Sequence, residues 1–98
     1  MNDFFDAARR FLLGYLPKQR CLSENTILSY KQTLNLFVSY MRDGKGIATV
    51  ELTFSRIDRD TILGFLTWLE NVRKCSASTR NQRLMALRSF LEFAGQMD

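Results

Sequence analysis

The sequence contains no histidine among its 98 residues. Histidine is the side chain most often used for proton transfer near neutral pH, and it is the commonest metal ligand. A glycine-rich phosphate loop, cysteine pairs at metal-binding spacing and a nucleophile elbow are missing from the sequence as well. We therefore expect no self-contained hydrolase or metalloenzyme, no cofactor and no small-molecule substrate. Asp58 and Asp60 are expected to start a helix rather than to hold a metal.

Cysteine is scarce, and no long hydrophobic run is present. Cys21 and Cys75 lie far apart in a chain without a secretory signal, which predicts two thiols of an intracellular protein rather than a disulfide scaffold. The N-terminus has no basic stretch followed by an apolar segment. We expect a soluble, cytoplasmic protein with no membrane partner.

Proline and glycine are rare, at one and five residues. Apolar residues recur at intervals of three and four rather than two, and a chain of this length forms one domain. The sequence predicts an all-α fold of four helices, at residues 3–15, 24–42, 58–73 and 78–94, within a single domain spanning 1–98. Expected helix starts are Asn2 or Asp3, the segment 23–25, Asp58, and Ser76 or Ser78. Expected stops are Pro17, the segment 43–46 and Gly95.

Each predicted helix has an apolar stripe. The third should bury Ile62, Phe65, Leu66, Leu69 and Val72, and its Gly64 should allow a close helix approach. Val50, Thr53 and Phe54 in the loop at 47–56 are expected to pack across the bundle. The remaining core candidates belong to the first, second and fourth helices: Phe4, Phe5, Ala8, Phe11, Leu12, Tyr15, Ile27, Tyr30, Leu34, Phe37, Val38, Met41, Leu84, Leu87, Phe90, Leu91 and Ala94.

The net charge of +4 is unevenly distributed. Residues 17–42 and 73–98 each carry a net +3, whereas residues 43–72 carry −2 and residues 1–16 balance to zero. The basic excess therefore belongs to the second and fourth helices and the loops before them. A surface of this sign suits a polyanionic partner.

The start of the fourth helix indicates an anion-binding segment more clearly than the start of the second helix does. Extending its apolar stripe backwards from Leu84 reaches Arg80, so the first turn and a half, at residues 76–81, should overhang the core. Hydroxyls and guanidinium groups at a helix N-terminus favour an anion such as a DNA phosphate. On the second helix, Asn25, Ser29, Gln32 and Leu36 share a solvent face whose polar groups could reach base edges. The alternative is that these residues only cap the helices and keep the domain soluble.

Two segments of the sequence resemble a known family. The run Leu22-Ser23-Glu24-Asn25-Thr26-Ile27, followed by Tyr30, Leu34, Phe37 and Tyr40, is similar to the first motif of the N-terminal core-binding, SAM-like domain of tyrosine recombinases. The run Ser76-Ala77-Ser78-Thr79-Arg80-Asn81-Gln82-Arg83-Leu84, followed by Ala86-Leu87-Arg88-Ser89-Phe90, is similar to the second. Within this family, the sequence most resembles the phage-type integrases and the recombinases carried by bacterial mobile elements.

The resemblance implies a four-helix domain that clamps DNA at a recombination half-site together with a C-terminal catalytic domain. Carried over by position, the implied DNA-binding residues are Asn25, Thr26, Ser29, Ser78, Thr79, Arg80, Arg83 and Arg88. For Arg88 the resemblance leaves a structural or a phosphate-directed role open, and for Tyr30 it favours a structural one. The implied partners are double-stranded DNA and, in a full-length protein, other recombinase protomers.

The family's catalytic array is a tyrosine nucleophile with two arginines, a lysine and histidine or tryptophan partners. None of this array is matched here, so Tyr15, Tyr30 and Tyr40 are not nucleophile candidates, and the chain is expected to be a non-catalytic domain of a larger recombinase. Two other functions stay open: a helical protein-interaction module, and a small regulator that binds a palindrome as a dimer.

Overall fold

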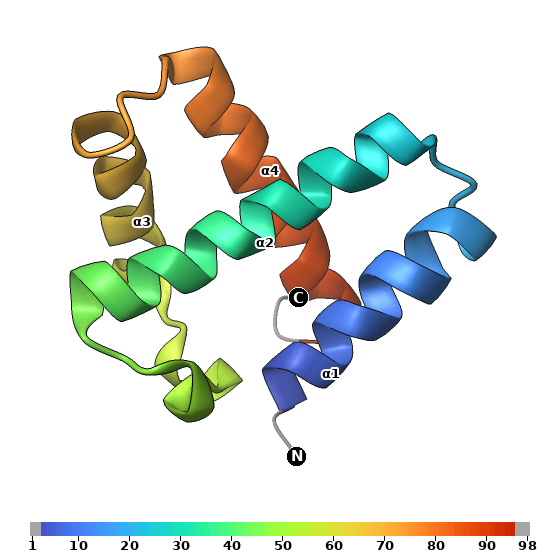
Figure 1. Cartoon of the computed structure of the whole chain (residues 1–98), viewed down its shortest axis with the longest axis horizontal. Coiled ribbons are helices and arrows are strands. Elements are labelled where there is room, and N and C mark those ends of the chain that lie inside the picture. The colour runs from blue at the N-terminus through green and yellow to red at the C-terminus, as the bar shows by residue number, and fades with distance from the viewer. Residues whose placement is uncertain (1–2, 96–98) are drawn as a thin grey trace.

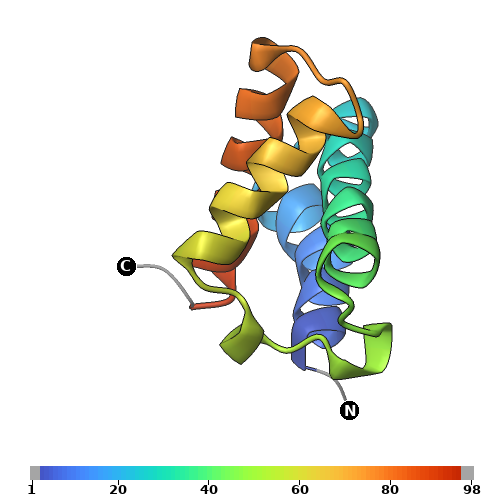
Figure 2. The ribbon, with the colours of Figure 1, turned by 90° about the vertical axis from the view of Figure 1, so that its left-hand side faces the viewer.

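The structure is a computed structural model that describes residues 3–95. Its elements are α1 (Asp3–Arg10), the π-helical η1 (Phe11–Gln19), α2 (Glu24–Lys45), two short 3₁₀ turns η2 (Thr49–Glu51) and η3 (Phe54–Arg56), α3 (Arg59–Asn71) and α4 (Ala77–Phe93). No strand occurs in this range, so the all-α, four-helix prediction is confirmed. α2 crosses α4, and α3 and the α1–η1 segment pack towards opposite ends of α2 (Figure 1). Seen from the side, α2 forms one flank of the domain, with α3 and α4 on the other (Figure 2).

The helix starts follow from local capping. Ser23 and Ser76 accept a hydrogen bond from the backbone N–H three residues later, each at 3.2 Å. Asp58 caps α3 and accepts from both the N–H and the hydroxyl of Thr61, each at 2.8 Å. These hydrogen bonds lower the pKa of the Asp58 carboxyl. The predicted starts at residues 23 and 58 are therefore confirmed, and Ser76 is the cap of the fourth helix. Asn2, a candidate cap for the first, lies outside the described residues.

The helix ends differ more from prediction. α2 runs to Lys45, three residues beyond the predicted bound of 42, and the left-handed residue that ends it is Gly46 (φ 69°), within the predicted stop segment 43–46. α3 ends at Asn71 rather than 73. Non-glycine residues adopt the left-handed conformation at Cys21 (φ 53°) and Lys74 (φ 56°). After each of the three left-handed residues, Cys21, Gly46 and Lys74, the next residue donates its N–H to a backbone carbonyl six residues earlier. The pairs are Leu22 to Leu16, Ile47 to Met41, and Cys75 to Leu69.

The sequence predicted that the first helix ends at Pro17, and this prediction is wrong. The chain continues through Pro17 in the wider π-helical turn of η1, as far as Gln19. In an α-helix, proline removes a hydrogen bond and clashes with the carbonyl four residues back. In η1 the bonding step is five residues, as in the 2.9 Å bond from the Arg20 N–H to the Tyr15 carbonyl, so the carbonyl four residues back is not required as an acceptor.

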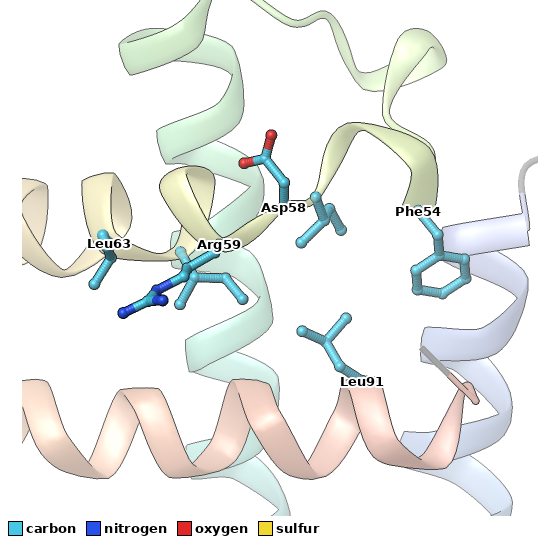
Figure 3. Close-up of a pocket in the computed structure, with 7 residues that line it drawn as sticks. Phe54, Asp58, Arg59, Leu63 and Leu91 are labelled. Carbon is cyan, nitrogen blue, oxygen red and sulfur yellow. The ribbon is translucent and has the colours of Figure 1, made fainter. Parts of the chain in front are cut away.

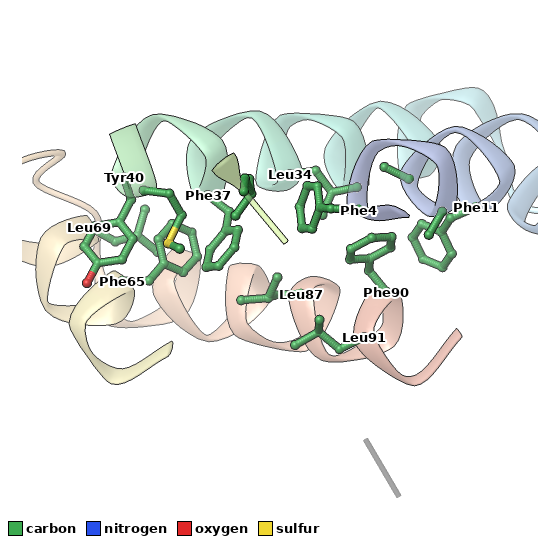
Figure 4. Packing of buried hydrophobic residues seen from close by; sticks show 14 of the residues in the cluster. Phe4, Phe11, Leu34, Phe37, Tyr40, Phe65, Leu69, Leu87, Phe90 and Leu91 are labelled. Atoms are coloured by element: carbon green, nitrogen blue, oxygen red, sulfur yellow. The ribbon is translucent and has the colours of Figure 1, made fainter. Parts of the chain in front are cut away.

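A row of aromatic rings fills the core between α2 and α4 (Figure 4). Phe11 and Phe90 lie with ring centroids 5.4 Å apart, and Phe37 and Phe65 lie 5.2 Å apart, both edge to face. Phe4 joins the two halves, at 5.3 Å from Phe90 and 6.2 Å from Phe37. These five phenylalanines come from α1, η1, α2, α3 and α4, so the same cluster holds every long helical element in place.

Three predicted core positions are wrong. Val72 is 61% exposed because α3 ends before it, and Val50 is 86% exposed on the short turn η2. Thr53 is exposed as well. The loop instead buries Leu52, while Phe54 packs against Phe4 at 5.6 Å as expected.

Gly64 allows the predicted close approach of α3 to α2. The ring of Tyr40 from α2 lies over it, and a Cβ atom at this position would overlap the Tyr40 hydroxyl. Burial of this ring raises the pKa of Tyr40. Over the described part of the chain, no helix is long and apolar enough to cross a membrane.

Candidate nucleic-acid interface

An open groove of about 770 Å³ lies between the N-terminal halves of α2 and α4. The two helices diverge from their crossing towards these ends, at the top of Figure 1. The groove is lined by Asn25, Thr26, Ser29, Tyr30, Ser78, Asn81, Gln82, Met85 and Ala86. Most of these side chains carry hydroxyl or amide groups, which can both donate and accept hydrogen bonds.

Four of the eight residues assigned to DNA from the sequence line this groove: Asn25, Thr26, Ser29 and Ser78. The structure thus brings together two motifs separated by about fifty residues of sequence. Gln82 and Met85 belong to the same surface and were missed. Their spacing from Ser78, at four and seven residues, was the available signal, because such positions share one face of a helix.

Thr26 and Thr79 take part in capping. Besides the backbone bonds, the Thr26 hydroxyl lies 3.0 Å from the Ser23 hydroxyl, and the Ser76 hydroxyl donates to that of Thr79 at 3.2 Å. Each helix start is therefore organised by a Ser/Thr pair. These two threonines help to hold the first turns that present the groove residues.

The sequence predicted that the start of α4 overhangs the core freely. This prediction is wrong, because two of its arginines bond to neighbouring helices. Arg80 forms an ion pair with Glu70 of α3 and donates to Asn81 at 3.1 Å. Arg83 turns towards α2, where its Nη1 donates to the Ser29 carbonyl and to the Thr33 hydroxyl, both at 3.1 Å. The reason is the length of arginine, whose guanidinium can reach a neighbouring helix from a position without core contacts.

Neither Arg80 nor Arg83 lines the groove between α2 and α4. Arg88 is exposed and follows Met85, a groove residue, by three positions, so it lies on the same face of α4, about one turn beyond the groove. The charged candidates therefore surround the groove rather than fill it.

A second, smaller polar hollow of about 370 Å³ lies beside Arg83. It is lined by Gln32, Asn35, Leu36, Ser39, Arg73 and Arg83. The guanidinium of Arg73 sits 5.8 Å from the centre of the Trp68 ring, a cation–π arrangement. Gln32 and Leu36, expected on the solvent face of α2, line this hollow rather than the groove.

An apolar pocket of about 300 Å³ lies away from these surfaces, between the start of α3 and the end of α4. Phe54, Ile57, Ile62, Leu63 and Leu91 form its walls, with Asp58 and Arg59 at one side. Figure 3 shows the Asp58 carboxylate directed away from Leu91, in keeping with its role as a helix cap. The walls of this pocket are mainly apolar, and Arg59 is the basic side chain among the residues that line it.

Comparison with known proteins assigns the chain to a family. The family model for the phage integrase N-terminal SAM-like domain matches residues 9–97. The tyrosine recombinase XerD of Oceanobacillus iheyensis is 37% identical over 93 residues, covering 95% of this chain and 27% of that protein. The XerD of Listeria monocytogenes serotype 4b is 33% identical over 93 residues, with coverage of 95% and 28%.

A putative integrase/recombinase of Sinorhizobium fredii, y4rD, is 35% identical over 83 residues, covering 85% of this chain and 30% of that protein. The chain thus spans less than a third of the length of these relatives. No solved structure gives a significant match. The family model covers nearly the whole sequence, and the chain belongs to the N-terminal SAM-like domain family of phage integrases and tyrosine recombinases.

Proposed function

We propose that this domain binds double-stranded DNA for site-specific recombination, using the groove between α2 and α4. The observation that carries the proposal is the convergence of two polar helix N-terminal halves, distant in sequence, on one groove within a basic chain. Hydroxyl and amide side chains can bond to base edges in a major groove, and cations around them can neutralise phosphates.

Arg80 is the proposed phosphate contact closest to the groove. In the unbound domain it pairs with Glu70, and the two side chains are 32% and 41% exposed. A pair this exposed to water contributes little stability, so a DNA phosphate can replace the carboxylate at small cost. Its neighbour Asn81 lines the groove, so a phosphate held by Arg80 would lie at the groove edge.

Catalysis is proposed to reside in the remaining part of a longer recombinase. Tyr40 is buried against Phe65 and Trp68, and Tyr15 packs on Phe11 and Phe93. Neither hydroxyl has the environment of a nucleophile activated by an adjacent base. This chain would supply DNA affinity and orientation while the rest of the protein breaks and rejoins the strand.

We expect Arg80→Gln to weaken binding to a labelled mixed-sequence DNA duplex by about threefold to tenfold and to make the plot of log K against log salt less steep by about one unit. The change removes one phosphate contact and leaves Glu70 unpaired beside the DNA. Fluorescence anisotropy over a series of salt concentrations measures both quantities.

Arg9→Gln is the matched control, because it removes the same charge from α1, where Arg9 lies outside the groove. It should reduce affinity by less than about twofold through the change in net charge alone. Equal effects of the two substitutions would show that binding follows net charge and not this site.

A second surface favours a protein partner. Leu12, Leu13, Ile27 and Leu28 line an apolar hollow of about 430 Å³ between η1 and α2, and Leu13 is 62% exposed. Exposed apolar patches of this kind commonly mark protein contacts. If the domain showed no measurable duplex binding at about 50 mM salt, a helical protein-interaction module would be the better description.

A further inference from the structure

Arg83 joins α4 to α2 through a small closed network. Its Nη1 donates to the Ser29 carbonyl and to the Thr33 hydroxyl, both at 3.1 Å. Thr33 is only 1% exposed, and its hydroxyl donates to the same Ser29 carbonyl at 3.1 Å. The network therefore connects the second turn of α4 to the second and third turns of α2.

Stability alone does not account for an arginine at this position. The Nε atom of Arg83 is buried without a hydrogen-bond partner, and among residues 3–95 no carboxylate forms an ion pair with this side chain. Leaving a buried donor unsatisfied costs about 1–3 kcal/mol, a cost that an apolar side chain of similar length would avoid. What the guanidinium provides is directional bonding, which fixes the placement of one helix relative to the other.

The network lies behind the groove that we propose for DNA. Ser29 lines the groove, and its carbonyl accepts a hydrogen bond from Arg83. On α4, Gln82 precedes Arg83 directly and lines the opposite wall. Arg83 thus couples the two walls at the level where they face each other.

We propose that Arg83 is a positioning residue for DNA binding, which sets the spacing of the groove walls through Ser29 and Thr33 and makes no phosphate contact itself. The inference rests on the proposed function of the groove. The family resemblance implied that Arg83 contacts DNA, whereas this inference gives it an indirect role. The two roles can be distinguished, because loss of a phosphate contact changes the salt dependence of binding and loss of a positioning residue does not.

The test uses substitutions on both sides of the network in the same anisotropy assay. Arg83→Met should weaken duplex binding by about fivefold to tenfold, while changing the salt slope by less than half of the change produced by Arg80→Gln. Thr33→Val, a neutral change at a residue that DNA cannot reach, should weaken binding by about threefold at unchanged slope. Thr33→Ser keeps the hydroxyl and should bind within about twofold of the unmodified domain.

The double variant Arg83→Met, Thr33→Val should bind no more weakly than Arg83→Met alone, within about twofold, because both changes break one network. Circular dichroism and urea unfolding verify that each variant is folded under assay conditions. The inference is overturned if Arg83→Met flattens the slope as much as Arg80→Gln, or if folded Thr33→Val binds normally. By contrast, failure of the unmodified domain to bind duplex DNA overturns the proposed function.

Discussion

Ser78→Glu should weaken duplex binding by about a hundredfold without destabilising the domain, because like charges brought together in an interface cost several kcal/mol. Ser78 lines the groove one residue after Ala77, the first residue of α4. A carboxylate there would face the DNA backbone. At the same time it would lie at the positive end of the helix dipole, which favours an acidic residue by about 0.3–1 kcal/mol.

This substitution separates binding from folding, since its two effects have opposite signs. Anisotropy gives the loss of affinity, and urea unfolding gives the change in stability. Thr67→Glu introduces the same charge at an exposed position of α3 that is not part of the groove, and it should alter binding by less than about threefold. Near-normal binding of Ser78→Glu would remove the start of α4 from the interface.

Phe90→Ala should lower the free energy of unfolding by about 3–5 kcal/mol, a large share of the stability of a small domain. The ring is 0% exposed and lies 5.3 Å from Phe4, 5.4 Å from Phe11 and 6.0 Å from Phe54. Its removal leaves a cavity that α1, η1 and the loop before α3 cannot all close at once. Urea denaturation followed by circular dichroism measures the loss.

Leu63→Ala is the comparison for this core prediction, because Leu63 is 49% exposed on α3. Its loss should be below about 1.5 kcal/mol, in line with the smaller area removed from water. A loss below about 1 kcal/mol for Phe90→Ala would mean that the aromatic row does not hold the helices together as described.

Helix starts were predictable from sequence because capping is local. Ser23, Asp58 and Ser76 each bond to a backbone N–H three residues away, so the signal and its partner lie in one short segment. Helix ends were harder to predict. Cys21 and Lys74 adopt left-handed conformations that glycine usually supplies, and nothing in their identity indicates this. The predicted helix end at Pro17 was wrong because a π-helical turn accommodates proline where an α-helical turn does not, and nothing in the sequence indicates a π-helical turn.

The candidate site was predictable to the extent that it depends on helix faces. Asn25, Ser29 and Ser78 were placed by periodicity and by the family resemblance, and the structure brings them to one groove. The directions of Arg80 and Arg83 depend on which helix packs beside them. Glu70 and Thr33 are ten and fifty residues away in sequence, so these pairings could emerge only from the packed fold.

The most direct test of DNA binding through the groove between α2 and α4 is a salt titration of the unmodified domain with a labelled DNA duplex. Neutralisation of about five phosphates predicts that log K falls linearly with log salt, with a slope near −4 to −5. Binding that is undetectable at about 50 mM salt, or that is insensitive to salt, would contradict the account.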